Sequence, residues 1–215
     1  MILGHESRAV MVTALVSGIV LGLSAGLAPG PMLALVLAQT FRHGPREGCK
    51  VALSPLVTDP PIILVTLFLA NRLAELRPLL GLISIAGAIF VLYLAWESYR
   101  AVLSDATSVA EHPQSWVKGI VTNLLNPHPW IFWLTVGAAV LAKLMAQGWP
   151  AVAAFLVGFY VLLIGSKVLL ALLTGKSRHW LAGRGYRVAM RVLAGLLAGF
   201  ALLLFREGWR QMAGG

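Results

Sequence analysis

The sequence predicts an all-α integral membrane protein with six transmembrane helices, arranged as two inverted three-helix repeats. Of the 215 residues, 59% are hydrophobic and only 12% are charged, and the mean hydropathy is +0.83. A soluble domain carries about 25% charged residues, and a chain of this size cannot bury so much apolar surface in one core. These values exclude an ordinary soluble enzyme, a disordered chain and a disulfide scaffold.

Six apolar runs reach the length of about 20 residues that a transmembrane helix needs. They cover roughly residues 10–40, 50–70, 79–99, 118–142, 150–173 and 188–206. The runs are uniformly apolar, whereas the strands of a membrane barrel would alternate. We therefore expect one membrane domain over residues 1–215, in which a polar linker (101–117) separates a first repeat (1–100) from a second (118–215).

The net charge of +9 would by itself suggest a nucleic-acid partner. The charged residues fall in short gaps between the apolar runs, however, so we expect the partner surface to be a lipid bilayer and not nucleic acid.

Lys and Arg are unevenly divided between the two sides of the membrane. One side has ten, namely Arg42, Arg46, Lys50, Arg100, Lys118, Lys176, Arg178, Arg184, Arg187 and Arg191. The other has six, namely Arg8, Arg72, Arg77, Lys143, Arg206 and Arg210. The richer side is expected to face the cytoplasm, which places both termini outside the inner membrane.

Small residues form a regular stripe in the first apolar run. The stripe consists of Gly18, Gly22, Gly26 and Gly30. Such spacing lets two helices pack closely in lipid, and it favours a retained helix over the alternative of a cleaved signal peptide at residues 1–28. A second pair, Gly195 and Gly199, predicts another close contact, either within the chain or between two copies in a homodimer.

The first run of each half contains a P-x-P motif. The two motifs are Pro29-Gly30-Pro31 and, directly after Asn126, Pro127-His128-Pro129. Each proline lacks an N–H donor and disturbs the carbonyl four residues earlier, and lipid cannot satisfy a carbonyl freed in this way. Three spans in each half make the halves cross the membrane in opposite directions, a plan common in secondary transporters with broken helices at the solute site. The alternative is a simple packing kink.

These motifs resemble those of a known family. The segment 22–31, GLSAGLAPGP, is similar to the signature of the lysine exporter (LysE) family of translocators. Further similar positions are Gly44, Gly48, Asp59, the segment 92–96 (LYLAW), Arg100, the segment 119–123 and Asn126-Pro127. The resemblance covers nearly the whole chain and implies an inner-membrane exporter of amino acids or similar small metabolites, driven by proton antiport. His128 and Pro129 stand where the family often has lysine, which leaves the substrate open.

Asp59 is the one carboxylate deep within a predicted span, and such a residue is costly unless it has a function. We expect it to carry the coupling proton. The alternative is structural: Pro55, Pro60 and Pro61 would break the span and Asp59 would cap its restart. Lys167, in the fifth run, either extends to the interface or pairs with Asp59.

The residues expected to bind the substrate are the two motifs and the polar side chains near them. They are Pro29, Gly30, Pro31, Asp59, Asn123, Asn126, Pro127, His128 and Pro129. For the two asparagines, bridging between helices is the simpler alternative; His128 either titrates or bonds a freed carbonyl. The histidines show no paired ligand spacing, so we expect neither a metal nor another cofactor.

Three classes of function remain after the sequence alone. The first is the secondary transporter, which is not an enzyme; no G-x-x-x-x-G-K-[ST] motif is present to use ATP directly. The second is an intramembrane serine hydrolase built on Ser24, in the G-x-S-x-G match at residues 22–26, with His128 as its base. The third is a membrane assembly protein that transports nothing.

Overall fold

The computed structural model describes residues 2–69, 77–103, 112–177 and 184–213. These residues form helices and short connections, with no strand among them. Along the chain the elements are α1 (Ile2–Leu27), α2 (Pro31–His43), α3 (Pro45–Leu53), α4 (Pro55–Leu69), α5 (Arg77–Leu103), α6 (Ser115–Leu124), α7 (Pro127–Phe132), the π-helical turn η2 (Trp133–Gly137), α8 (Ala138–Met145), α9 (Trp149–Ser177) and α10 (Arg184–Met212). Of the residues that carried earlier predictions, 104–111 in the linker and Arg72 and Arg178 in the charge count lie outside this description.

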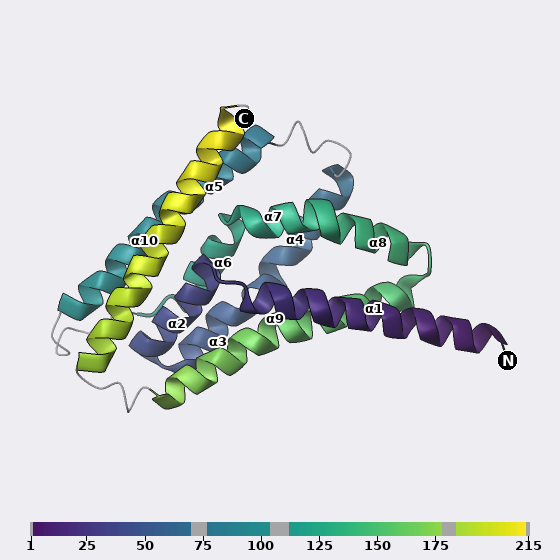
Figure 1. Cartoon of the computed structure of the whole chain (residues 1–215), viewed down its shortest axis with the longest axis horizontal. Coiled ribbons are helices and arrows are strands. Elements are labelled where there is room, and N and C mark those ends of the chain that lie inside the picture. The colour runs from purple at the N-terminus through teal and green to yellow at the C-terminus, as the bar shows by residue number, and fades with distance from the viewer. Residues whose placement is uncertain (1, 70–76, 104–111, 178–183, 214–215) are drawn as a thin grey trace.

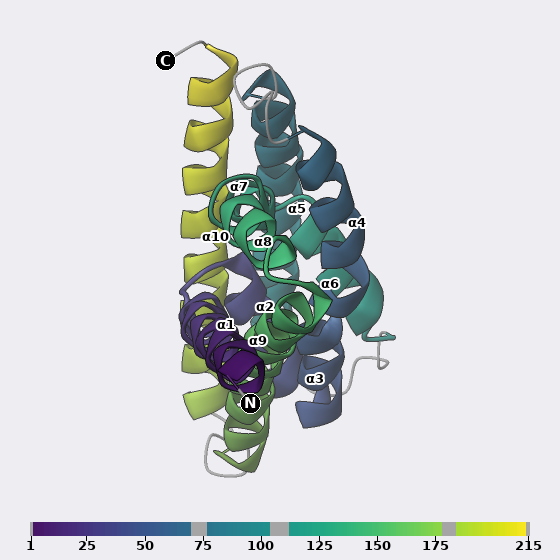
Figure 2. The ribbon, with the colours of Figure 1, turned by 90° about the vertical axis from the view of Figure 1, so that its right-hand side faces the viewer.

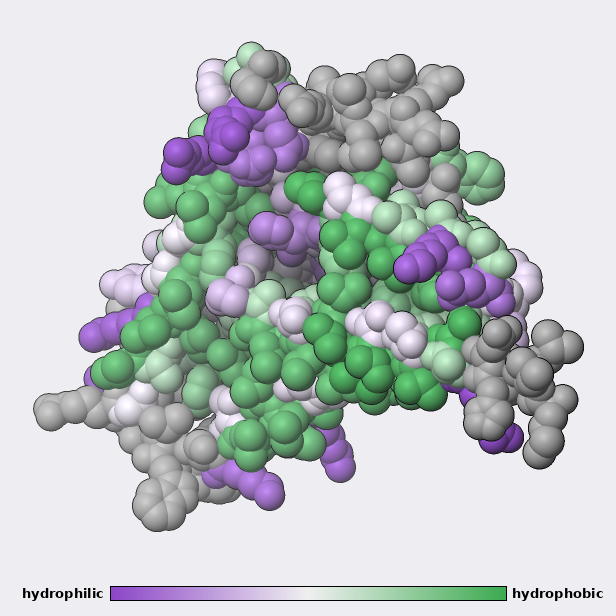
Figure 3. Space-filling model, turned by 45° about the vertical axis from the view of Figure 1, so that its right-hand side comes forward, coloured by the Kyte–Doolittle hydropathy of each residue, from purple (hydrophilic) through white to green (hydrophobic). Residues whose placement is uncertain are grey.

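Among the residues that the structure describes, six helical stretches are long and apolar enough to cross a membrane. They are Arg8–Leu27, Pro45–Thr66, Gly81–Arg100, Pro127–Met145, Trp149–Lys176 and Arg187–Met212. Large apolar side chains also cover the outside of the molecule: Phe68, Trp149 and Leu202 are each more than 70% exposed. Figure 3 shows this apolar surface on one face, with hydrophilic side chains mainly towards its margins. The predicted all-helical, multi-pass membrane protein is confirmed.

The two predicted runs that contain a P-x-P motif are each divided into separate helices. The first run, 10–40, consists of the long helix α1 and the separate short helix α2, and the fourth, 118–142, is divided between α6 and the stretch α7–η2–α8. In each case the following helix begins at a proline, Pro31 or Pro127, which is suited to the first helical position because its missing N–H would have no partner there. As a result α1 spans the membrane without α2, and α7–α8 does so without α6.

Two long helix pairs form the arms of the molecule (Figures 1 and 2). In one arm α5 runs antiparallel to α10: a Cβ atom added to Gly208, near the end of α10, would lie 2.7 Å from the carbonyl oxygen of Gly81, near the start of α5. In the other arm α1 runs parallel to α9. The shorter helices α2, α3, α4, α6 and α7 lie between the arms, and the core around α2 includes the fully buried Val36 and Val51.

The predicted glycine stripe forms the contact between α1 and α9. A Cβ atom on Gly18 would lie 2.9 Å from the backbone nitrogen of Phe159, and one on Gly22 would lie 2.8 Å from the Cα of the same residue. One on Gly26 would lie 3.0 Å from the carbonyl oxygen of Leu162. The fourth member of the stripe differs, because a Cβ on Gly30 would meet nothing within 4 Å. Only three of the four glycines therefore serve helix packing.

We expect Gly22→Leu to destabilise the protein by about 1–3 kcal/mol, because the new side chain must push α1 away from the backbone of α9. The measurement is the thermal unfolding midpoint of the purified protein in detergent. Gly165→Leu is the matched control, since a Cβ there meets nothing within 4 Å and the gain in helix propensity is the same. Equal midpoints for the two variants would show that the α1–α9 contact does not need glycine.

The second glycine pair makes no close contact inside the chain. A Cβ atom on Gly195 or on Gly199 would meet nothing within 4 Å in the described structure. Two alternatives were left open for this pair, and the prediction of a close contact within one chain is therefore wrong. The homodimer remains a prediction.

Candidate functional site

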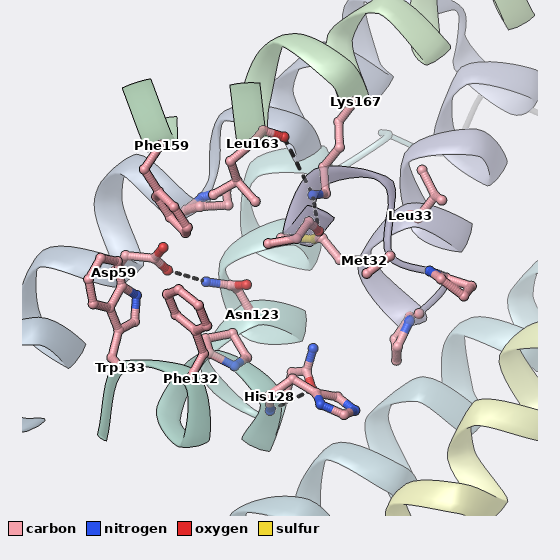
Figure 4. Close-up of a pocket in the computed structure, with 18 residues that line it drawn as sticks. Met32, Leu33, Asp59, Asn123, His128, Phe132, Trp133, Phe159, Leu163 and Lys167 are labelled. Atoms are coloured by element: carbon pink, nitrogen blue, oxygen red, sulfur yellow. Dashed lines mark hydrogen bonds between the residues drawn. The ribbon is translucent and has the colours of Figure 1, made fainter. Parts of the chain in front are cut away.

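A cavity of about 300 Å³ lies between the two places where the prolines interrupt the helical course. Its walls come from the α1–α2 connection, α4, the stretch from α6 to η2, and α9 (Figure 4). This volume is at the lower end of the range for small-molecule sites, which is about 300–1,000 Å³. The site is therefore large enough for a small metabolite.

The first interruption lies between Leu27, where α1 ends, and Pro31, where α2 begins. Pro29 has no N–H to donate to the carbonyl four residues earlier, which is that of Ala25. The ammonium of Lys167 takes this place: its Nζ donates to the Ala25 carbonyl at 3.3 Å and to the Leu163 carbonyl of its own helix at 3.5 Å. A side chain of α9 thus satisfies the end of α1, as the absence of water in the membrane requires.

The second interruption is satisfied by the same principle with different groups. α6 ends at Leu124, and the side chain of Asn126 accepts a hydrogen bond from the backbone N–H of His128 at 3.1 Å, which caps α7. The carbonyl of Leu124, which that N–H would have reached in a continuous helix, accepts instead from the indole Nε1 of Trp130 at 2.9 Å. Asn126 is therefore a helix cap at the cavity wall.

Asp59 lies inside α4 and is 3% exposed. Its Oδ1 accepts from Asn123 Nδ2 at 2.8 Å, and its Oδ2 accepts from the hydroxyl of Tyr160 at 3.3 Å. The Asn123 amide also donates to Thr58 Oγ1 at 2.6 Å, so it bridges α6 to α4. The alternative in which Asp59 caps a restarted helix is wrong, because Pro60 and Pro61 lie within a helix that begins five residues earlier.

Three aromatic rings stand beside the carboxylate (Figure 4). Phe132, Trp133 and Phe159 contact one another with ring centroids 5.2 to 5.3 Å apart, in edge-to-face and stacked arrangements. Trp133 begins the π-helical turn η2, whose wider backbone turn is typical of functional positions in helices. The carboxylate therefore faces an apolar, aromatic compartment and not bulk solvent.

Lys167 and Asp59 line the same cavity, and Lys167 is 4% exposed. Their charges interact, but the described residues include no ion pair between them. In Figure 4 the ammonium lies near Met32 and the carboxylate lies near Asn123, on different sides of the cavity. The cavity therefore contains one acidic and one basic side chain that are not paired with each other.

A second charged cluster lies where α2 ends. Glu97 Oε1 accepts from Arg42 Nη1 and from Lys118 Nζ, both at 2.6 Å, and the three side chains are 8–12% exposed. Close by, Ser115 donates to Gln39 Oε1 at 3.2 Å. Burial, followed by the charge of Arg42, lowers the pKa of His43 below its usual value, so this histidine is neutral near pH 7. The cluster fastens α2, α5 and α6 together at the end of the molecule that carries most basic residues.

Comparison with known proteins supports the resemblance seen in the sequence. The family model described as LysE type translocator matches residues 23–208. The chain belongs to this family. It is also 29% identical over 197 residues to the uncharacterized membrane protein YahN of Escherichia coli (strain K12), and the similarity covers 85% of each chain. No solved structure matches it.

The structure of this LysE-family chain brings eight of the nine predicted site residues to one cavity. They are Pro29, Gly30, Pro31, Asp59, Asn123, Asn126, His128 and Pro129. The ninth, Pro127, is buried at the start of α7 and does not line the cavity. The side chain of His128 is exposed, whereas Asn123 and Asn126 are buried. Asn123 makes the bridge between helices that was its structural alternative, whereas Asn126 caps α7.

Several cavity residues were missed by the sequence-based reasoning. Phe132, Trp133, Phe159 and Leu163 line the cavity, and none of them was predicted as a site residue. They resemble the many other apolar residues of their helices, so no local signal distinguishes them. Their role depends on the close approach of α9 to α1 and of η2 to α4.

Ser24 does not line the cavity. It is exposed on α1, and its hydroxyl donates to the carbonyl of Val20 at 2.8 Å, one helical turn earlier. This bond is the usual local contact of a serine within a helix. The structure of the translocator gives no support to the serine-hydrolase alternative.

Proposed function

We propose that this translocator is a secondary transporter that exports amino acids or similar small metabolites across the inner membrane by proton antiport. The observation that carries the proposal is that one cavity touches both helix interruptions and contains the buried carboxylate of Asp59. A spanning protein with a purely structural role has no need for a buried acid beside a hollow of this kind.

We further propose that the chain is built as two inverted repeats, which move against each other in an alternating-access cycle. The equivalent parts would be α1–α2 and α6–α8, α3–α4 and α9, and α5 and α10. The packing supports this assignment, since α5 lies against α10 and each broken stretch contacts the second span of the opposite half. The orientation proposed from the basic residues places the charged cluster around Glu97 at the cytoplasmic end.

Asp59 supplies the coupling in this proposal. When it is ionised it attracts the cationic part of a substrate, and when it is protonated it no longer does so. Proton and substrate therefore compete for the same carboxylate. A proton arriving from the outside releases the substrate there, and loss of that proton to the cytoplasm restores the site for the next molecule. The eight predicted residues that line the cavity are the proposed binding site.

The experiment is transport by the purified protein in lipid vesicles, with a panel of labelled amino acids and small cations, in the presence and absence of a pH gradient. We expect protons that flow down their gradient to drive at least one amino acid across the membrane in the opposite direction. Protein-free vesicles give the background.

We expect the double variant Pro29→Ala/Pro127→Ala to lose transport while it still inserts and purifies normally, because a more continuous helical course changes the cavity walls. Transport that is independent of the pH gradient would overturn proton antiport. Full function in the double variant would show that the interruptions serve only packing.

A further inference from the structure

The electrostatics of the cavity show which part of a solute each end can accept. Among the described lining residues, Asp59 supplies a carboxyl group and Lys167 supplies an amine. They are buried, carry opposite signs when ionised and form no ion pair with each other. A solute with no net charge but with one positive and one negative group would match the pair.

The end that holds Lys167 has a second feature suited to an anion. α2 begins at Pro31 beside the cavity, and in the described structure no side chain caps its first turn. The first N–H groups of a helix have no partner within the helix, and they carry the positive end of its dipole. A Cβ atom on Gly30 would meet nothing within 4 Å, so the approach to these groups is open. A carboxylate at this place would meet both the ammonium and the start of α2.

Most of the other residues that line the cavity are apolar. Met32, Leu33, Phe132, Phe159 and Leu163 form much of its lining (Figure 4). A third charge on the solute would lie against these side chains without a partner, at a high cost in free energy. An uncharged aliphatic or aromatic side chain would gain by leaving water.

On this basis, and resting on the proposed transport function, we propose that the site selects zwitterionic amino acids with apolar side chains. Lys167 and the start of α2 bind the α-carboxylate, and Asp59 binds the α-ammonium. The same ammonium of Lys167 also serves the freed carbonyl of Ala25. Its two bonds of 3.3 and 3.5 Å leave one of its three donors for the substrate.

The test is equilibrium binding to the purified full chain in lipid nanodiscs, with labelled L-leucine as the probe. The competitors are L-leucinamide, which lacks the carboxylate, 4-methylpentanoate, which lacks the amine, and L-lysine and L-glutamate, which add a charge. We expect each competitor to bind roughly 10- to 100-fold more weakly than L-leucine, because each leaves a buried charge without its partner.

We then expect Lys167→Gln to bind L-leucine at least about tenfold more weakly and to lose the preference for L-leucine over L-leucinamide. The glutamine amide keeps a donor for the Ala25 carbonyl, so a merely structural role would leave that preference unchanged. Lys143→Gln, at an exposed lysine of α8, is the control and should bind as the unaltered chain does. The comparison of competitors uses the unaltered chain, so it tests the selection of zwitterionic amino acids even if Lys167→Gln does not fold.

Equal binding of L-leucine and L-leucinamide to the unaltered chain would overturn the inference, as would tighter binding of L-lysine or L-glutamate. So would the absence of L-leucine binding in a preparation that transports another amino acid, and in that case the proposed transport function would stand. If no amino acid is transported in the vesicle experiment, the proposed export of amino acids is itself wrong. The two failures are thus distinguishable.

Discussion

Asp59→Asn is expected to reduce transport driven by a pH gradient to the level of protein-free vesicles. Asparagine has nearly the shape of aspartate and can still accept the hydrogen bond from Asn123, so the contact between α4 and α6 remains. It cannot exchange a proton, and it cannot attract a cationic group as an ionised carboxylate does. The coupling reaction should disappear while the fold persists.

The measurement is substrate uptake together with proton flux, followed with a pH-sensitive dye inside the vesicles. Glu207→Gln is the matched control, because it makes the same kind of change at a carboxylate of α10 whose side chain is 41% exposed and outside the cavity. It should leave both signals unchanged. Substrate-dependent proton flux that survives in Asp59→Asn would refute the role of this carboxylate as the proton carrier.

Glu97→Gln is expected to destabilise the protein by about 3 kcal/mol, at the lower end of the cost of breaking a buried ion pair. Glu97 is the shared counter-charge of Arg42 and Lys118, and its side chain is only 12% exposed. Without it two positive charges face each other where α2, α5 and α6 meet. The lower end applies because the cluster still touches solvent, which screens the charges.

The same Glu207→Gln variant serves as the control for stability. Glu207 interacts with Arg210 at 3.7 Å between side chains that are 41% and 64% exposed, and an exposed pair of this kind contributes about 0–1 kcal/mol. The thermal unfolding midpoint in detergent should therefore fall clearly for Glu97→Gln and barely for Glu207→Gln. Similar unfolding midpoints for the two variants would mean that the cluster around Glu97 does not stabilise the fold.

α2 extends from the cavity to the cluster around Glu97. This helix begins at Pro31, beside the cavity, and ends at His43, next to the Glu97 cluster. We propose that the 13 residues of α2 move as one unit. In the proposed cycle, release of the cluster would accompany movement of the cavity wall at Gly30 and Pro31.

Composition and periodicity were enough to predict the membrane helices, because an apolar stretch of about 20 residues has few stable alternatives in lipid. The glycine spacing likewise predicted a close helix contact, and three of its four members make it. Gly30 follows the same spacing but lies beyond the end of α1. The pattern could not show where the helix stops and the connection begins.

The sequence by itself determined that the chain crosses the membrane, that prolines interrupt its course and that a carboxylate lies buried, since each follows from local composition and backbone chemistry. Only the tertiary structure decided that α9 supplies Lys167 to the end of α1, that Asn123 and Tyr160 hold Asp59, and that aromatic rings close the site. These contacts join residues that are 64 to 142 positions apart. Their formation depends on which helices pack together, and the glycine spacing marks a contact face on α1 without indicating its partner.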